Sequence, residues 1–163
     1  MKIHLLDADL HFPPVSAAGD HGLLAVGGDL SPARLMAAYE HGTFPWFMED
    51  EPIMWWAPPE RAVLPAQGLK VTKSMRNILN RRPFRVTMDR CFEEVVRQCQ
   101  KAPRDGEGTW ITDDIVEAYV ALHDLGVAHS VEAWRDDELV GGLYGVSLGR
   151  MFFGESMFST HSN

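Results

Sequence analysis

A single carboxylate stands in an apolar segment near the end of the sequence. The segment RMFFGESMFS, residues 150–159, surrounds Glu155 with three phenylalanines and two methionines. A carboxylate in such surroundings needs a partner, because burial otherwise disfavours its charge and raises its pKa. Either a ligand amine or an arginine from elsewhere in the chain would serve. Glu155 is therefore a candidate ammonium-binding group, with a structural ion pair as the alternative.

The alternation of a β-strand fixes which neighbours share a face with Glu155. It places Phe153 and Met157 on the same face as Glu155, and Phe152 and Gly154 on the other. A bulge at Gly154 would reset this register. In either register, apolar side chains flank the carboxylate.

Three glycines lie in the preceding segment LVGGLYG, at Gly141, Gly142 and Gly145. They fall inside a strand pattern, not at a strand-to-helix turn, so they make a poor dinucleotide-binding loop. Glycines within a strand indicate a close approach to the backbone. The approaching group is either a bulky ligand or another element of the fold.

Four of the five tryptophans lie in segments that look like loops: Trp46, Trp55, Trp56 and Trp110. Loop tryptophans are often platforms on which bases of a nucleic acid stack. The alternative is that they enclose a small core.

Positive charge is concentrated in one window of an acidic chain. The formal net charge is −8, yet ten of the fifteen basic residues fall between Lys70 and Arg104, with three acids among them. Such a window could hold a polyanion backbone while the acidic remainder repels it, which favours a local, oriented contact. A solvated helical face is the alternative.

Capping residues and periodicity predict the elements that must position these groups. Ser31 and Gly42 delimit a first helix, with Pro32 at its first position. The proline-rich segment 43–64 that follows excludes regular helix or central strand, and indicates an ordered aromatic loop or short strands.

The rest of the chain alternates helices and strands. Thr72, Asp89 and Thr112 are predicted to cap three helices, and residues 84–88 alternate as a strand between the first two. Three strands over 129–135, 139–148 and 150–159 then form an antiparallel meander, because short turns join them. The predicted fold class is α+β.

Several functional classes lack support in the sequence. The seven histidines form no metal-binding spacing, and no nucleophile triad or phosphate-binding loop is present. No segment approaches the ~20 apolar residues that cross a bilayer, and acids occupy the N-terminus where a signal peptide would be apolar. We therefore expect a cytoplasmic protein without membrane partners.

The chain resembles one family over nearly its whole length after residue 12. The resemblance is carried by GLLAVGGDLSPARLMAAYEHGTFPWF, PIMWWAPPERAVL, RVTMDRCFEEVVRQC, GTWIT and HSVEAWRDDELVGGLYGVSLGRMFFGESMFS, in this order. These segments resemble the bacterial leucyl/phenylalanyl-tRNA–protein transferases.

The resemblance implies an enzyme that moves leucine, phenylalanine or methionine from aminoacyl-tRNA to proteins with N-terminal arginine or lysine, creating a degradation signal. It implies a small N-terminal domain, residues 1–62, and an N-acetyltransferase-like domain of the GNAT superfamily, residues 63–163. Because the aminoacyl ester is already activated, neither ATP nor a metal or other cofactor is expected.

The resemblance also implies roles for particular residues. Glu155 matches the family's essential glutamate, so it is the predicted catalytic residue. The predicted site for the tRNA 3'-terminal adenosine and the amino-acid side chain comprises Trp46, Trp110, Leu143, Phe152, Gly154, Glu155 and Met157. The predicted contacts with the tRNA backbone are Arg76, Arg81, Arg82 and Arg85.

One departure from the family pattern affects the predicted activity. Family members continue with a strand whose aspartate and glutamine assist deprotonation of the attacking amine, and this sequence lacks that strand. We therefore expect a fragment whose GNAT-like sheet is incomplete after its central strands, and which is inactive alone. The alternatives are a noncatalytic aminoacyl-tRNA-binding fragment and an acyl-CoA-dependent N-acetyltransferase.

Overall fold

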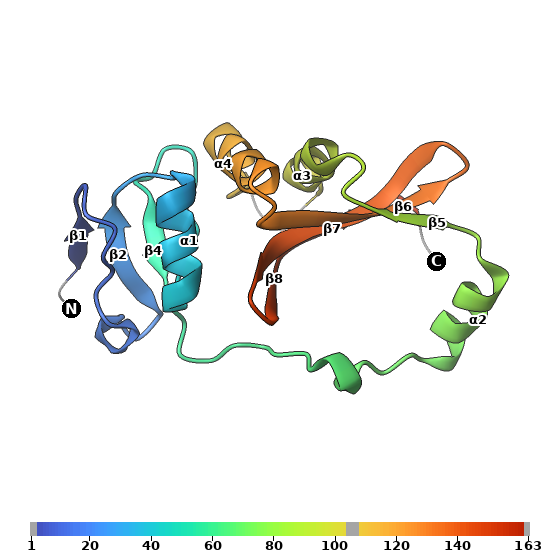
Figure 1. The fold of residues 1–163 in the computed structure, drawn as a ribbon, viewed down its shortest axis with the longest axis horizontal. Helices are drawn as coiled ribbons and strands as arrows, with labels where there is room; N and C mark the ends of the chain where they lie inside the picture. The colour runs from blue at the N-terminus through green and yellow to red at the C-terminus, as the bar shows by residue number, and fades with distance from the viewer. Residues whose placement is uncertain (1–2, 104–107, 162–163) are drawn as a thin grey trace.

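The computed structural model describes residues 3–103 and 108–161. Its described elements form two four-stranded sheets and four α-helices, in the α+β class that the sequence predicts. The two sheets stand at opposite ends of the molecule in Figure 1, and a long connection runs between them beneath the second sheet. No helix among the described residues is long and apolar enough to cross a membrane.

The N-terminal sheet has the strand order β1-β2-β4-β3. Strand β1 pairs in parallel with β2, and the other pairs are antiparallel. The strands are β1 (His4–Leu6), β2 (Leu23–Gly27), β3 (Phe44–Pro45) and β4 (Met54–Trp56). The proline-rich segment thus contains two short strands. The prediction that it excludes a central strand is wrong, because β4 pairs with β2 on one side and β3 on the other, and the prolines lie outside β4. Pro45 lies on the edge strand β3, where a missing N–H is tolerated.

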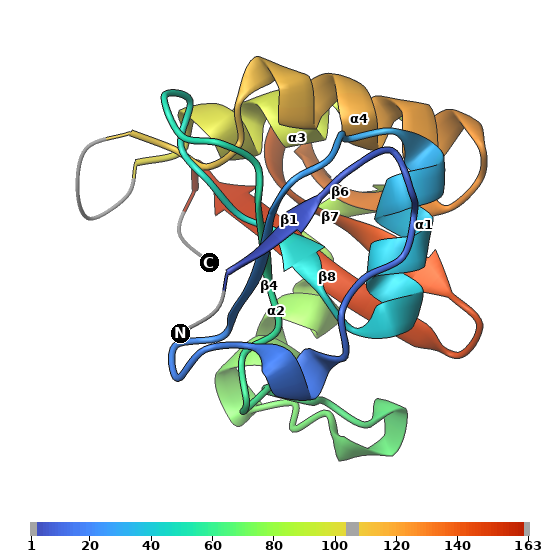
Figure 2. The same ribbon diagram turned by 90° about the vertical axis from the view of Figure 1, so that its left-hand side faces the viewer.

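The C-terminal sheet is an antiparallel meander in the order β5-β6-β7-β8, which confirms the predicted run of strands. The strands are β5 (Arg85–Met88), β6 (Ala128–Arg135), β7 (Glu138–Leu148) and β8 (Met151–Ser159). Helices α3 (Phe92–Lys101) and α4 (Asp113–Asp124) cover one face of this sheet (Figures 1 and 2).

Side-chain caps confirm three of the four predicted helix starts. Ser31 begins α1 (Pro32–His41), Thr72 begins α2 (Lys73–Arg81) and Thr112 begins α4, each with its hydroxyl accepting a backbone N–H of the first turn. The prediction that Asp89 caps α3 is wrong. Cys91 occupies the cap position instead, because the Asp89 carboxylate accepts the Ser130 N–H and contacts the His129 ring.

One continuous core joins the two ends of the molecule. Leu35 of α1 and Trp55 of β4 belong to the same buried cluster as Val95 of α3 and Tyr119 of α4. Helix α1 packs against α4, so the N-terminal elements are held directly on the helical layer of the C-terminal sheet. The region between them is therefore built to a fixed geometry.

Helix α2 differs from the other helices because none of its residues is buried. It lies on the connection between β4 and β5, at the end of the molecule opposite the N-terminal sheet (Figure 1). Its apolar residues Met75 and Leu79 are exposed. The last residue of the basic window, Arg104, lies outside the described residues.

Candidate active site

Glu155 lies at a β-bulge in the edge strand β8. Tyr144 of β7 pairs with Ser156 and the next residue, Gly145, pairs with Gly154, so Glu155 has no partner across the ladder. A bulge re-aims the side chain of the extra residue. The sequence left a bulge at Gly154 open as an alternative to regular alternation; the strand does contain a bulge, and the unpaired residue is Glu155.

The Glu155 side chain lines a cleft of about 1120 Å³ between β8 and the N-terminal elements. Apolar and aromatic side chains make up most of the wall, as is usual for ligand sites. The lining residues are Tyr39, Phe44, Pro45, Trp46, Arg61, Ala62, Val63, Leu64, Pro65, Ala66, Trp110, Arg150, Met151, Phe152, Phe153, Gly154 and Glu155.

Burial dominates the electrostatics of the Glu155 carboxyl. It raises the pKa of this group to about 7, against hydrogen bonds from the Tyr39 and Tyr119 hydroxyls and the charge of Arg61, which all lower it. Near neutral pH the group is thus divided between its two protonation states. A ligand cation in the cleft would favour the ionised state.

Two tyrosine hydroxyls act on this carboxylate, one from Tyr39 in the wall of the cleft and one from Tyr119 behind it. The Tyr119 hydroxyl of α4 donates to Glu155 Oε2 at 3.3 Å, and the Tyr39 hydroxyl of α1 is hydrogen-bonded to that of Tyr119. Tyr39 also packs its ring against Phe153, with centroids 5.2 Å apart. Burial raises the pKa of both phenols well above its usual range, so both stay protonated and act as donors.

The two tryptophans predicted for a base-binding site both line this cleft. Trp46 is 45% exposed and meets Trp56 edge-on, with ring centroids 5.6 Å apart. The Trp56 indole N–H donates to the Trp46 carbonyl at 2.7 Å, which fixes the backbone beneath the exposed ring. Trp110 is half-buried against the core. An exposed, fixed indole in a cleft can stack on a nucleobase.

The predicted pocket residues are only partly brought together. Phe152, Gly154 and Glu155 line the cleft with Trp46 and Trp110. Leu143 and Met157 are cross-strand partners in β7 and β8 and do not line it; Met157 is 72% exposed. The predicted roles of Leu143 and Met157 stay predictions.

Packing explains the glycines of β7. A Cβ at Gly145 would lie 2.2 Å from the Phe153 carbonyl and 2.6 Å from the Phe152 ring. At Gly142 it would lie 2.9 Å from Phe158 and 3.1 Å from Val95. The elements that approach this backbone are β8 and α3, so of the two explanations for these glycines, packing is the one that the structure supports.

The four predicted tRNA-contacting arginines lie outside the cleft. Arg76 and Arg81 are in α2, Arg82 ends that helix, and Arg85 opens β5. All four are exposed. The Arg85 guanidinium lies over the Trp134 ring, 5.2 Å from its centroid. The α2 helix and β5, which carry them, lie at the end of the molecule away from the N-terminal sheet (Figure 1), and we call these four arginines the basic surface around α2.

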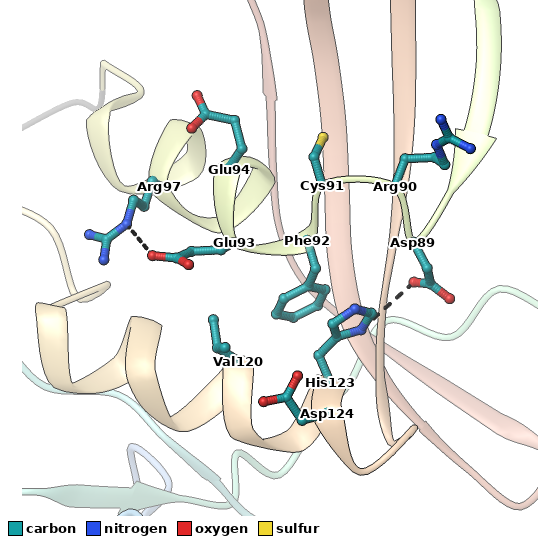
Figure 3. Close-up of a pocket in the computed structure, with 10 residues that line it drawn as sticks. All are labelled: Asp89, Arg90, Cys91, Phe92, Glu93, Glu94, Arg97, Val120, His123 and Asp124. Atoms are coloured by element: carbon teal, nitrogen blue, oxygen red, sulfur yellow. Dashed lines mark hydrogen bonds and ion pairs between the residues drawn. The ribbon is translucent and has the colours of Figure 1, made fainter.

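A second pocket, of about 550 Å³, lies between the start of α3 and the end of α4 (Figure 3). Two of its charged groups are held by partners in the protein: Arg97 pairs with Glu93 at 2.8 Å, and Asp89 with His129, outside the pocket lining, at 2.8 Å. The His123 ring lies flat on Phe92, with centroids 4.3 Å apart. These pairings are those of a structural surface. Within the described ranges, no group of three or more His, Cys, Asp or Glu residues could hold a metal ion.

Comparison with known proteins identifies the family. The family model for leucyl/phenylalanyl-tRNA protein transferase matches residues 63–163, and the model for the N-terminal domain of that transferase matches residues 28–59. The chain belongs to the leucyl/phenylalanyl-tRNA protein transferase family. The predicted resemblance is thus confirmed.

Individual members of the family are similar over the whole chain. The leucyl/phenylalanyl-tRNA–protein transferase of Flavobacterium johnsoniae is 55% identical over 99% of the chain, which covers 76% of that protein. That of Syntrophus aciditrophicus is 59% identical over 100% of the chain and 69% of the relative, and that of Pseudoalteromonas atlantica 52% over 100% and 70%.

Three residues of the site were not predicted from the sequence. Tyr119 occupies a core-facing helical position, and Tyr39 has no local pattern that distinguishes it from a core tyrosine. Arg61 follows the two prolines of the connection; its guanidinium donates to the Gly42 carbonyl at 2.7 Å and lies over the Phe44 ring. Only the fold brings these residues to Glu155, so a single sequence holds no signal for them.

Proposed function

We propose that this chain carries the aminoacyl-tRNA site of an aminoacyltransferase that moves leucine, phenylalanine or methionine to proteins with N-terminal arginine or lysine. The observation that carries the proposal is the position of Glu155, a half-buried carboxylate in an apolar cleft that Trp46 and Trp110 also line. The three curated relatives, 52–59% identical, are all named as this transferase, which supports the same assignment.

Each part of an aminoacyl-adenosine has a matching group in the cleft. In the proposed complex, the adenine stacks on the indoles, the apolar side chain lies against the Phe152 and Phe153 segment, and Glu155 binds the α-ammonium. A carboxylate that binds an ammonium in an apolar cleft forms a charge-assisted hydrogen bond, which is about twice as strong as a neutral one. The carboxylate then fixes the orientation of the ester, while the apolar wall selects the side chain.

The transfer step follows from this orientation. The neutral N-terminal amine of the acceptor attacks the ester carbonyl; the new C–N bond forms and the C–O bond to the terminal ribose breaks. The attacking nitrogen loses one proton, and the ribose oxygen leaves as a hydroxyl with one proton gained. Alignment of two bound substrates can supply about 7–11 kcal/mol of the barrier reduction.

The basic surface around α2 is proposed to bind the tRNA backbone. Arg76, Arg81, Arg82 and Arg85 present positive charge on an otherwise acidic chain, so phosphate groups would be attracted to this surface. The basic surface is separate from the cleft. This suits a long ligand whose phosphates contact the basic surface while its aminoacylated end lies in the cleft. This arrangement would bind the tRNA in one orientation.

The organisation of the chain is proposed on the same basis. Residues 1–62 form the N-terminal unit and residues 63–163 part of a GNAT-like transferase unit, and the protein acts in the cytoplasm. The meander β5-β6-β7-β8 with two helices on one face is compatible with the central strands of such a unit.

Transfer of labelled leucine from leucyl-tRNA to a peptide with N-terminal arginine tests the proposed function. We expect the protein to bind leucyl-tRNA, any transfer to require the free amine and not to reach the N-acetylated peptide, and Trp46→Ala to weaken leucyl-tRNA binding about tenfold or more, since one base-stacking contact contributes about 1–3 kcal/mol. Val15→Ala is the matched control, because Val15 is apolar, 45% exposed like Trp46, and does not line the cleft. Binding of phenylalanyl-tRNA without transfer would support the noncatalytic alternative. A protein that shows no binding and no transfer would contradict the proposal.

A further inference from the structure

A chain of two hydroxyls connects the N-terminal unit to Glu155. Tyr39 is 4% exposed in α1 and Tyr119 fully buried in α4. Their hydroxyls are hydrogen-bonded to each other, and that of Tyr119 donates to Glu155 Oε2. Two helices that pack on each other therefore place two phenols behind one carboxylate.

The direction of these hydrogen bonds follows from the number of protons that each hydroxyl can donate. A phenol has one proton to donate, and Tyr119 directs its proton at Glu155, so the shared bond between the tyrosines carries the proton of Tyr39. The chain therefore runs from Tyr39 through Tyr119 to the carboxylate. A donor to a carboxylate favours its ionised form, and hydrogen bonds in series polarise one another.

The bulge gives these donors a second role. Glu155 is the residue of β8 without a cross-strand partner, so the sheet ladder does not fix its side chain directly. The donors that act on its carboxylate are the two tyrosines, while Arg61 contributes the charge across the cleft. Loss of a tyrosine hydroxyl would thus change both the direction and the charge of the carboxylate.

We infer that Tyr39 and Tyr119 are positioning residues that orient Glu155 and keep it ionised for the substrate ammonium, so that the N-terminal unit contributes directly to recognition of the aminoacyl group. This inference rests on the proposed function, because it assigns a task to groups behind the same carboxylate. Tyr119 does not line the cleft, and Tyr39 reaches its wall with only 4% of its surface exposed. Both act through Glu155.

Two phenylalanine variants and two ligands test the inference. The ligands are a phenylalanyl-adenosine analogue with a stable amide linkage and its counterpart without the α-amino group. At pH 7 we expect Tyr119→Phe to weaken binding of the amino ligand about tenfold, because a hydrogen bond to a charged group is lost. Binding of the counterpart should stay unchanged. Tyr39→Phe should show a smaller loss with the same selectivity.

The pH profile separates positioning from a structural role. The ionised form of Glu155 binds the ammonium, so affinity for the amino ligand falls as pH drops through the pKa of about 7. Removing a donor raises that pKa, so the acidic limb should move to higher pH in Tyr119→Phe. The basic limb belongs to the α-amino group of the ligand, near pH 7.7–8, and should not move.

Tyr144→Phe is the matched control, because Tyr144 is equally buried and meets Tyr119 edge-on outside the Tyr39–Tyr119–Glu155 chain. Its acidic limb should coincide with that of the wild type. Equal losses for both ligands in Tyr119→Phe, or an unmoved acidic limb, would overturn the inference while the proposed function stands. A wild-type protein that does not prefer the amino ligand would overturn the proposed function, and the inference with it.

Discussion

Glu132 and Glu155 are two carboxylates in the C-terminal sheet, on strands β6 and β8 to either side of β7, and their surroundings differ in kind. Glu132 in β6 is fully buried and accepts hydrogen bonds from the Thr87 hydroxyl, the Ser130 hydroxyl at 2.6 Å and the Arg90 N–H at 3.2 Å. Glu155 in β8 opens onto a cleft and meets hydroxyls only from behind. The first carboxylate is satisfied by the protein; the second leaves acceptor capacity facing the cleft.

The hydrogen-bond donors around a carboxylate distinguish a structural acid from one that binds a ligand. A buried carboxylate surrounded by donors joins elements, here β5 and β6, and its partners leave no room for a ligand. A carboxylate at a bulge in an edge strand, held from one side and raised in pKa to about 7, is poised for a cation that is not part of the protein. Substitutions at and around the two residues should therefore have different consequences.

The largest effect on stability is expected at Glu132. Glu132→Ala leaves the buried Ser130 hydroxyl, the half-buried Thr87 hydroxyl and one backbone N–H without their acceptor, and each such group costs up to about 1–3 kcal/mol. Because the hydroxyls can reorient, we expect a loss of about 4 kcal/mol in the free energy of unfolding, measured by urea denaturation. Glu132→Gln, which keeps an acceptor, should lose less. If Glu132→Ala leaves the free energy of unfolding unchanged, Glu132 is not a structural acid and its contrast with Glu155 fails.

At Glu155, replacing the carboxylate is expected to increase the free energy of unfolding at pH 8, opposite to the loss expected at Glu132. The pKa of Glu155 is raised from 4.5 to about 7 on folding, so between these pH values the unfolded state loses its proton while the folded state retains it. Stability from this group is therefore fully present below about pH 4.5 and is lost as pH rises through 7, by up to about 3 kcal/mol.

Glu155→Gln removes this titration but retains a hydrogen-bond acceptor for Tyr119. We expect the variant to unfold at higher urea concentration than the wild type at pH 8, and the difference to disappear near pH 4.5. A glutamine variant that is less stable than the wild type at pH 8 would mean that Glu155, like Glu132, is a structural acid.

A smaller effect on stability is expected at Gly145, the residue opposite the bulge. A methyl group there would overlap the Phe153 carbonyl and the Phe152 ring, so β8 must shift. Overpacking of this kind costs about 1–3 kcal/mol. Gly145→Ala should also weaken binding of the amino ligand, since it moves the wall of the cleft, whereas Gly149→Ala, at the open turn between β7 and β8, should leave binding unchanged.

The smallest effect on stability is expected at the basic surface. Arg81→Ala should not change the free energy of unfolding, because the residue is exposed and ends a helix without buried residues. It should reduce the slope of log affinity for tRNA against log salt concentration by about 0.7–0.9. Binding of the short amino ligand should be unaffected. An unchanged salt slope would remove Arg81 from the tRNA surface.

Local sequence patterns predicted much of the fold. Ser31, Thr72 and Thr112 are side-chain caps whose partners lie within the next turn, and the final meander follows from short turns between alternating strands. The cap assigned to Asp89 failed because its partners, Ser130 and His129, are 40 residues away. Strands β1 and β2 were missed because they are short and their pairing is nonlocal.

The candidate site was predictable in part for the same reason. Glu155 stands out because its own neighbours are apolar, and Trp46 and Trp110 because they fall in loop-like segments. Tyr39 and Tyr119 are separated by 80 residues and become site residues only when α1 packs on α4. Their role depends on tertiary contacts that no local pattern encodes.

The most direct test is whether Glu155 binds the α-ammonium group of the ligand. Binding of the amino and des-amino phenylalanyl-adenosine ligands should be compared at pH 7.5 in the wild type, Glu155→Gln and Glu132→Gln. We predict that the wild type and Glu132→Gln prefer the amino ligand by about 100-fold, and that Glu155→Gln has almost no preference. A Glu155→Gln variant that keeps the preference would contradict the assignment of Glu155 as the ammonium-binding group.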